Sequence, residues 1–150
     1  MKYKIKQLLT HNYRSVKEIF TDVFIPVGFT IAQLTYSWKN RSHSDSFGIF
    51  TSQGDLIGFA LVYEVACNPV NKYLSYISVY KSYAGEQLGS RLLTHTVKKV
   101  LKDGYGLHLY PLHHPKLINW YKSHGFHLVA NGYLNIHRHF TRYNTRYEYV

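Results

Sequence analysis

The residues best suited to chemistry lie in a short glycine-bearing segment in the middle of the chain. Three residues separate Gly85 from Gly89, and an amphipathic stretch follows directly. The first turn of a helix carries unpaired backbone N–H groups and the positive end of the helix dipole, and both attract phosphate. Because glycine has no side chain, a diphosphate could approach the amides of residues 84–90 closely. The same pattern occurs in strand-to-helix turns that bind nothing, so the signal is weak by itself.

This segment needs a strand before it and a helix after it. Residues Tyr73–Tyr80 mix aromatic and β-branched side chains, as expected for a largely buried strand. Beyond the glycines, the apolar residues that recur at helical spacing are Leu92, Leu93, Val97, Val100 and Leu101. The next strand, Leu107–Leu112, is expected to run parallel to the first, which gives a right-handed βαβ unit.

The rest of the chain divides into further strands and helices. The other predicted strands are Tyr3–Leu8, Phe47–Thr51, Leu56–Val65, His127–Val129 and Tyr133–Phe140. The other predicted helices are one that Asn12 caps and that ends before Pro26, one over Thr30–Trp38, and one over Pro115–Ser123. Turns are predicted at Ser52–Asp55, Asn68–Asn71 and Asn131–Gly132. The predicted order is therefore β-α-α-β-β-β-α-β-α-β-β.

Length and composition indicate a single globular domain. The chain has 150 residues, of which 45% are apolar and 17% aromatic, so one domain over residues 1–150 is expected. A single cysteine, Cys67, excludes an internal disulfide and fits a reducing compartment. No apolar run reaches membrane-spanning length, so a cytoplasmic protein without a membrane partner is expected. The net charge of +10 favours an anionic partner, such as a ligand with several phosphates or a nucleic acid.

Two stretches of the sequence resemble a known family. The stretch VYKSYAGEQLGSRLL resembles the acetyl-coenzyme A binding segment of the GNAT superfamily of N-acetyltransferases, and its matching residues are Val79, Tyr83, Gly85, Gly89, Ser90, Leu92 and Leu93. Downstream, NWYKSHGF (Asn119–Phe126) resembles the second signature of the family, a helix that ends in Y-x-x-x-G-F. Two motifs in this order are far more specific than either alone. The resemblance covers Tyr73–Val129.

The resemblance implies a fold, an activity and a set of contacts. The implied fold is the α/β (α+β) GNAT fold, a mixed central sheet of about seven strands flanked by about four helices. The implied activity is transfer of acetyl from acetyl-coenzyme A to a primary amine by direct attack, without a covalent enzyme intermediate. The residues that it places at the coenzyme are Ile77, Ser78 and Val79 through their backbone, the loop residues Ala84, Gly85, Glu86, Gln87, Leu88, Gly89 and Ser90, and the side chains of His114 and Tyr121.

Tyr121 and Glu64 are the expected catalytic residues. In the family, a tyrosine at the position of Tyr121 commonly protonates the departing thiolate, although fifteen tyrosines in the chain make a chance match easy. Glu64 is a carboxylate within an otherwise apolar predicted strand, and partial burial would make it a better base for the amine. His108 and Tyr80, near the ends of the two central strands, are alternative bases. An outward-facing Glu64 paired with a lysine explains the same pattern equally well.

The sequence departs from the family pattern at two loop positions. Ala84 stands where the family usually has arginine or glutamine, so a side-chain contact to phosphate is lost while the amide remains. Gln87 stands where the family usually has glycine, and its side chain could crowd the phosphate or resist the backbone angle that glycine accepts. The lysines that could compensate electrostatically are Lys81, Lys98 and Lys99.

Other chemistries have weaker support. The pairs His113–His114 and His137-x-His139 lack the ligand set and spacing of a zinc site, so no metal is predicted. His114 also stands where many family members have an asparagine that contacts the coenzyme, and it could equally cap a helix. The tail His137–Tyr147 interleaves arginines with aromatic residues, which could serve single-stranded nucleic acid, but packing of the aromatic rings is favoured.

Two hypotheses for function follow. The leading one is an acetyl-coenzyme A dependent N-acetyltransferase that acts on a small-molecule amine or a protein amine, and the basic surface disfavours a polycationic acceptor. The alternative is a weak or inactive module that binds coenzyme A or nucleic acid through that surface. The acceptor pocket would be built from Ile25–Ser46 and Asn131–Thr141. The sequence is compatible with a monomer or a homodimer.

Overall fold

The computed structural model describes residues 2–65, 68–112, 114–131 and 145–149. The described strands are β1 (Tyr3–Gln7), β2 (Phe47–Thr51), β3 (Leu56–Val65), β4 (Asn68–Val79), β5 (Gly106–Leu109), β6 (Phe126–Asn131) and β7 (Thr145–Tyr149). They form one mixed sheet in the order β1-β2-β3-β4-β5-β7-β6, in which β4 and β5 are parallel and the other pairs are antiparallel. The described α-helices are α1 (Tyr13–Val23), α2 (Ile31–Lys39), α3 (Leu88–Lys102) and α4 (Pro115–Ser123).

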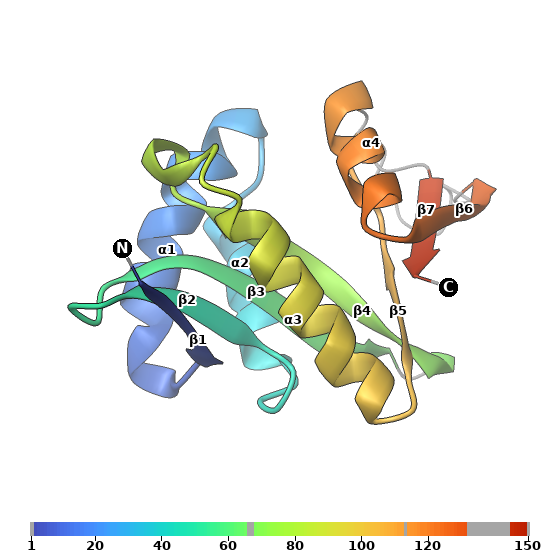
Figure 1. Ribbon diagram of the computed structural model, residues 1–150, viewed down its shortest axis with the longest axis horizontal. Helices are drawn as coiled ribbons and strands as arrows, with labels where there is room; N and C mark the ends of the chain where they lie inside the picture. Colours follow the sequence, from blue (N-terminus) through green and yellow to red (C-terminus); the bar gives the residue numbers. More distant parts are fainter. Residues whose placement is uncertain (1, 66–67, 113, 132–144, 150) are drawn as a thin grey trace.

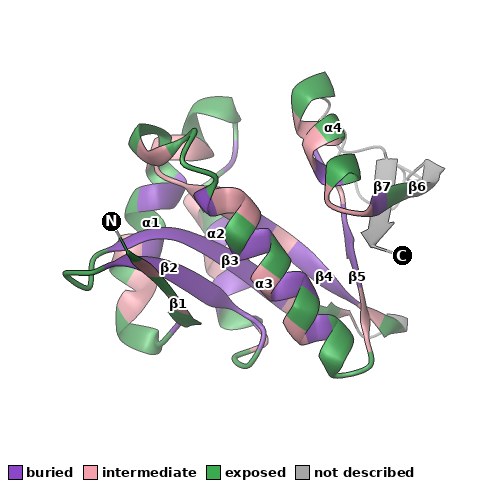
Figure 2. Cartoon of the chain, viewed as in Figure 1, coloured by how far each residue is buried: buried purple, intermediate pink, exposed green. Residues whose placement is uncertain are grey.

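The helices cover both faces of the sheet, with α1 and α2 on one face and α3 on the other (Figure 1). On the first face, Phe20 of α1 and Leu34 of α2 are fully buried against sheet residues such as Phe59. On the second face, Leu92 of α3 is fully buried in a separate core that also contains Tyr121 of α4. Figure 2 shows β2 and β3 buried along most of their length, since they lie between the two layers. The mixed α/β architecture expected from the sequence is confirmed.

Several predicted elements have the predicted bounds. The strands β2 and β3 and the helix α4 begin and end at the predicted residues. Thr30 caps α2, because its hydroxyl accepts from the amide of Gln33 while Gln33 Oε1 accepts from the amide of Thr30. The side chain of Asn12 does not cap α1 as expected, because its Oδ1 accepts instead from the amide of Leu9 (2.8 Å).

Two predictions around the central strand are wrong. The turn predicted at Asn68–Asn71 is part of β4, which begins at Asn68 and pairs there with Val65 of β3. Pro69 is tolerated because the ladder between β4 and β5 begins only at Asn71, so its missing N–H costs no bond there. The strand predicted to end at Leu112 ends at Leu109, before Pro111.

Two further differences concern the second half of the chain. Leu101 was expected to face the core, but it is exposed in the last turn of α3, while Val100 is fully buried. The strand predicted at Tyr133–Phe140 lies outside the described residues. The described partner of β6 is β7. On its other side β7 pairs with β5, so it lies between β5 and β6.

Candidate active site

The parallel strands β4 and β5 are paired over only a short length. Residues Asn71–Tyr73 pair with Gly106–His108, and beyond Tyr73 no described strand pairs with β4 on this side. On the other side, β4 stays paired with β3 as far as Val79, with a register shift at Ser75 that places one extra residue in β4. The strands therefore separate, and one edge of β4 is left open within the sheet.

The backbone groups that face this opening can be assigned from one hydrogen bond. The amide of Tyr80 donates to the carbonyl of Ile57 in β3 (2.9 Å). Successive residues of a strand direct their N–H and C=O groups to opposite sides. The backbone of Ser78 therefore faces β3, whereas the N–H and C=O groups of Ile77 and Val79 face the opening. Of the three residues expected to contact a ligand through their backbone, two are placed to do so and Ser78 is not.

A cavity of about 730 Å³ lies where the two strands separate. Its walls come from both faces of the sheet, with Phe24 and Tyr76 from the side of α1 and α2, and Leu117 and Tyr121 from α4. Ile77 of β4 also lines it. A cavity can join the two faces in this way only because β4 and β5 do not pair beyond Tyr73. A ligand could therefore enter from one face and meet a second ligand from the other.

Tyr121 combines burial with access to this cavity. Its exposed fraction is 7%, and its ring packs on Phe126 (ring centroids 5.7 Å apart) and on Trp120 (4.9 Å). Burial raises the pKa of the Tyr121 hydroxyl well above its ordinary value, because the anion would lose its hydration. The hydroxyl is therefore protonated at physiological pH and available as a hydrogen-bond donor.

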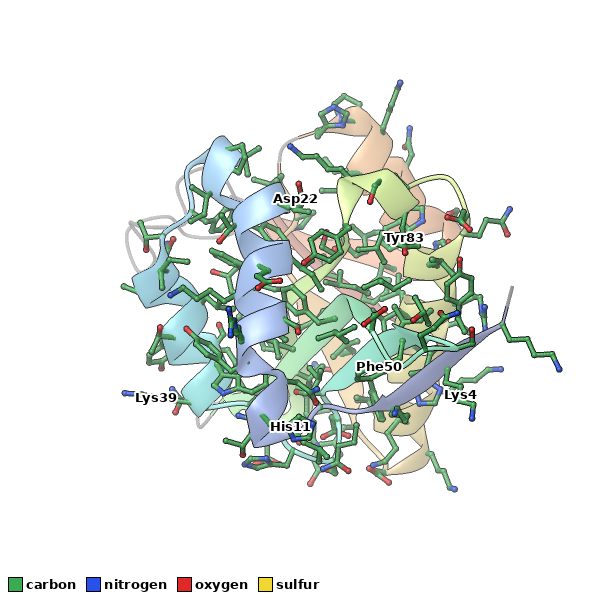
Figure 3. All side chains as sticks on the ribbon, turned by 90° about the vertical axis from the view of Figure 1, so that its left-hand side faces the viewer. Lys4, His11, Asp22, Lys39, Phe50 and Tyr83 are labelled. Atoms are coloured by element: carbon green, nitrogen blue, oxygen red, sulfur yellow. The ribbon has the colours of Figure 1, made fainter. Side chains whose placement is uncertain are left out.

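The glycine-bearing loop links β4 to α3 next to this opening (Figure 1). A short 3₁₀ turn, Lys81–Tyr83, follows β4, and Asp22 of α1 holds it by accepting from the amide of Lys81 (2.9 Å). Figure 3 shows Asp22 and Tyr83 at the same end of the molecule. Gly85 has a φ of 92°, and α3 begins at Leu88. The amides of the first turn of α3 are thus presented at the loop, as the sequence predicts.

Gln87 adopts the conformation expected of the glycine that it replaces. Its φ and ψ angles are 60° and 20°, in the left-handed region, and it is the N-cap of α3. Among the described residues it is the only non-glycine residue with a positive φ. A left-handed conformation costs an ordinary residue about 1–2 kcal/mol. The loop therefore keeps its shape at a cost in free energy, and the Gln87 side chain is exposed at the place where phosphate would bind.

The two sequence motifs contact each other through α3 and α4. Trp120 of α4 donates from Nε1 to the hydroxyl of Ser90 in the first turn of α3 (3.2 Å). Trp120 Cζ2 also lies 3.6 Å from the position that a Cβ on Gly89 would take. This contact ties the loop to the helix that carries Tyr121. Sequence reasoning missed it, although Trp120 stands directly before Tyr121.

The charges around the loop differ from the expectation. Lys99 is not free to compensate for Ala84, because its Nζ pairs with Asp45 (3.4 Å) and with Asp103. Lys81 is exposed beside the loop, and Arg91, which sequence reasoning missed, is exposed in the first turn of α3. Glu86 opposes them, since it adds a negative charge within the loop and accepts from the hydroxyl of Tyr3 (3.0 Å).

Glu64 does not lie in the candidate site. About 70% of its side chain is exposed, and it does not line the cavity. Its carboxylate lies 3.8 Å from the Nζ of Lys72, the residue opposite it in β4. The expectation of a part-buried carboxylate is wrong, because β3 extends past the core and its last residues reach solvent. The outward-facing ion pair that the sequence allowed is the observed arrangement.

The alternative bases are not brought to the cavity either. His108 is buried and stacks on Tyr73 (ring centroids 5.2 Å apart). Tyr73 lines the cavity, whereas His108 does not. Tyr80 donates to Glu18 of α1 (3.4 Å) in a separate polar pocket. His114 is the N-cap residue of α4, is exposed, and makes no side-chain cap hydrogen bond.

Some expected features fall on residues whose structure is not described. These are Cys67, His113, His137, His139, most of the tail His137–Tyr147, and nearly all of the expected acceptor segment Asn131–Thr141. Within the described part of the chain, no three His, Cys, Asp or Glu residues are grouped to hold a metal ion. No helix there combines the length and the apolar character needed to cross a membrane.

The aromatic side chains of the cavity are the main functional candidates that sequence reasoning missed. They come from the segment between α1 and α2, from α2, β3 and β4, and from the segment after β5, so no local spacing relates them. The excess of tyrosine, fifteen residues in the chain, was the one available signal.

Solved structures of other proteins have the same fold. Ard1 from Thermoplasma volcanium has a TM-score of 0.75 at 15% identity, covering 99% of this chain and 95% of that one. Arabidopsis thaliana Naa50 in complex with a bisubstrate analogue has a TM-score of 0.71 at 18% identity, covering 99% and 97%. The ribosomal-protein-S18-alanine N-acetyltransferase from Escherichia coli has a TM-score of 0.71 at 21% identity, covering 98% and 90%. Such identities establish a common fold alone.

The family is established by sequence. No curated protein matches the chain. The sequence profile described as acetyltransferase (GNAT) family, however, matches residues 11–126, which is more than half of the chain and includes both motifs and all four described α-helices. The chain belongs to the acetyltransferase (GNAT) family.

Proposed function

We propose that this member of the family transfers the acetyl group of acetyl-coenzyme A to a primary amine by direct attack, with Tyr121 as the general acid. The observation that carries the proposal is the cavity that passes through the sheet between β4 and β5 and contains Tyr121 in its wall. Beside it lies the loop that presents the first-turn amides of α3. One end of this arrangement suits the coenzyme, and the other suits an acceptor.

The coenzyme would lie along the open edge of β4. The amides of residues 88–90 and the positive end of α3 would face its diphosphate. The N–H and C=O groups of Ile77 and Val79 would pair with the amide groups of its pantetheine arm. The thioester would then lie between β4 and Tyr121.

The reaction needs few side chains. The nitrogen of the free amine attacks the acetyl carbonyl carbon, and a backbone N–H of Ile77 or Val79 would stabilise the oxyanion that forms. The C–S bond then breaks, and the thiolate takes its proton from the Tyr121 hydroxyl. The amine nitrogen releases one proton to solvent. The Tyr121 phenolate takes one proton back from solvent, which restores the hydroxyl. No carboxylate base is required if the amine enters unprotonated.

The test separates binding from turnover. The unfolding midpoint is measured with acetyl-coenzyme A, with coenzyme A and with ATP, and release of free thiol is measured with a panel of amines. A ligand at 100 times its dissociation constant stabilises the folded state by about 2.7 kcal/mol. Stabilisation by acetyl-coenzyme A well beyond that by ATP, together with amine-dependent thiol release, is the expected result.

Two observations favour a second candidate. The strained Gln87 and the acidic Glu86 both oppose phosphate binding, which favours a weak or inactive module. Binding of coenzyme A without release of thiol for any amine would support that candidate against the enzyme. Absence of stabilisation at millimolar acetyl-coenzyme A would reject both uses of the loop.

A further inference from the structure

Two groups of aromatic side chains line the cavity on the face of the sheet that α1 and α2 cover. The first aromatic group packs with ring centroids 5.1 to 5.6 Å apart and consists of Phe24, Phe29 and Tyr76. The second aromatic group is a chain with successive centroid distances of 6.1, 5.1 and 5.8 Å and consists of Tyr36, Tyr63, Tyr73 and Tyr110. All seven residues line the cavity. An acceptor that entered from this face would therefore meet the faces and edges of both groups of rings.

The part of these walls that the structure describes carries no formal charge. The lining residues that the structure describes include no lysine, arginine, histidine, aspartate or glutamate. Burial raises the pKa of Tyr76 to about 12 and raises the pKa of Tyr63 well above its ordinary value, so both hydroxyls are neutral at physiological pH. A carboxylate or a second ammonium group on the acceptor would lose its hydration there without gaining a partner.

An acceptor that has one amine group and an aromatic ring avoids both losses of hydration, because it has no carboxylate and no second ammonium group. Its ring can stack against the aromatic groups, which is worth about 0.5–1.5 kcal/mol per ring pair beyond the buried area. Its ammonium group can be held over a ring face at first, and the loss of water then favours release of its proton. An uncharged aromatic site thus produces the unprotonated nucleophile without a carboxylate base, which fits the position of Glu64 outside the cavity.

We propose that the acceptor is a small arylalkylamine, a primary amine joined by a short chain to an aromatic ring and bearing no other charge. The volume of about 730 Å³ lies within the range of about 300–1,000 Å³ typical of sites for small ligands. The arm of acetyl-coenzyme A would share this volume, which favours a small acceptor. The inference rests on the proposed acetyl transfer and narrows it to one substrate class.

The first experiment compares acceptors at one concentration of acetyl-coenzyme A. Phenethylamine and tryptamine represent the proposed class, and spermidine, glutamate and a short peptide with an N-terminal phenylalanine represent the competing ones. We expect kcat/KM for the two arylalkylamines to exceed that for each of the others at least tenfold. A higher value for spermidine, for glutamate or for the peptide would overturn the inference.

Two variants test the walls themselves. Ala32→Trp places a ring in the cavity from an exposed position on α2 and should raise KM for phenethylamine at least tenfold. Thr94→Trp makes a similar insertion on α3, on the other face of the sheet, and should change KM less than twofold. An unchanged KM in Ala32→Trp would contradict the proposed site.

Gln33→Glu adds a charge to the lining without removing the helix cap, since a glutamate oxygen can also accept from the amide of Thr30. It should raise kcat/KM for spermidine relative to phenethylamine at least tenfold. The matched change Gln53→Glu, in the turn between β2 and β3, should leave this ratio unchanged. An equal ratio in both variants would place the acceptor elsewhere.

Failure of the inference can be told apart from failure of the proposed function. Heat of binding of phenethylamine to the protein loaded with coenzyme A is measured beside the coenzyme's own dissociation constant. Coenzyme binding without binding of phenethylamine overturns only the inference that the acceptor is an arylalkylamine. Absence of coenzyme binding overturns the acetyl transfer on which it rests.

Discussion

Tyr121 is the side chain on which the proposed chemistry most depends. It is held by Phe126 and Trp120, and Trp120 in turn contacts Ser90 at the start of α3. The proposed acid and the proposed coenzyme loop are therefore positioned by one set of contacts. A ring fixed in this way can deliver a proton without first being ordered, so its effect should appear in kcat rather than in binding.

Tyr121→Phe should lower kcat by about 10²–10⁴-fold, the usual contribution of a positioned acid, while the dissociation constant of coenzyme A stays within threefold. Steady-state thiol release and calorimetry measure the two quantities. Tyr105→Phe, a matched change outside the cavity lining, should alter neither. Full activity in Tyr121→Phe would remove the acid assignment.

Gln87→Gly should tighten binding of coenzyme A severalfold. The change removes the exposed side chain from the loop and relieves a left-handed residue. The added flexibility of the unfolded chain offsets part of the gain in stability, so the free energy of unfolding should change by less than about 1 kcal/mol. Calorimetry and urea unfolding check the two values. Weaker coenzyme binding would mean that the Gln87 side chain itself contacts the ligand.

At the residue scale, the sequence predicts where a residue lies in the fold better than how far its side chain is buried. The places of Gly85, Gly89 and Tyr121 follow from motif order. Glu64 does not, because its surroundings depend on how far β3 extends beyond the core. Pairing of Glu64 with Lys72 would have been the signal, but it requires the register of β3 against β4, and that register contains two shifts.

At the scale of elements, a buried ion pair fixes β4 to its neighbours. Lys72 of β4 and Asp45, in the segment before β2, are almost fully buried, and Lys72 Nζ lies 2.6 Å from Asp45 Oδ2. Lys99 of α3 approaches the same carboxylate (3.4 Å). Burial alone would raise the pKa of Asp45, but hydrogen bonds from Lys72 and Ser42 outweigh it and hold the pKa below its ordinary value. The carboxylate is therefore ionised and joins the segment before β2 to β4 and α3.

Lys72→Met should reduce the free energy of unfolding by about 3 kcal/mol at pH 7, because it leaves Asp45 buried beside the more exposed Lys99 alone. The stabilisation from a depressed carboxyl pKa is present above the unfolded value of about 3.9 and is lost as pH falls through the lower folded pKa. The difference from the native protein should therefore shrink as pH falls below about 4. Urea unfolding across this range gives both values. A constant difference would exclude the ion pair as the cause.

The elements that the sequence predicts well are those with strong local signals. The turn Ser52–Asp55 separates β2 from β3, and Pro115 and Gly125 delimit α4. The start of β4 and the position of β7 depend instead on pairing between distant segments, which overrides the turn preference of asparagine and proline. The separation of β4 from β5, which creates the cavity, has no local signal at all.

At the scale of the whole molecule, the buried tyrosines make the free energy of unfolding decrease at alkaline pH. Burial raises the pKa of Tyr76 to about 12 and also raises the pKa of Tyr63 and Tyr121. Above pH 10 these hydroxyls ionise in the unfolded chain but not in the folded one. Their stabilisation is therefore present below pH 10 and is lost as pH rises toward the folded pKa.

The free energy of unfolding should fall steeply between pH 10 and 12. The fall should be smaller in Tyr76→Phe by about the contribution of one ionising hydroxyl. Urea unfolding at a series of pH values measures both curves. Parallel curves for the two proteins would show that other groups, such as the lysines, cause the alkaline loss.

The short ladder between β4 and β5 also makes this boundary a weak one in the sheet, like the equally short ladder between β5 and β7. Three residue pairs join the two strands, compared with eight between β3 and β4. The unit that follows, from β5 through α4, should therefore open without global unfolding, and its amides should exchange hydrogen faster than those of β3. Because the cavity has walls on both sides of this boundary, a ligand bound in it would act as a clamp, and slower exchange in β5 would report its binding.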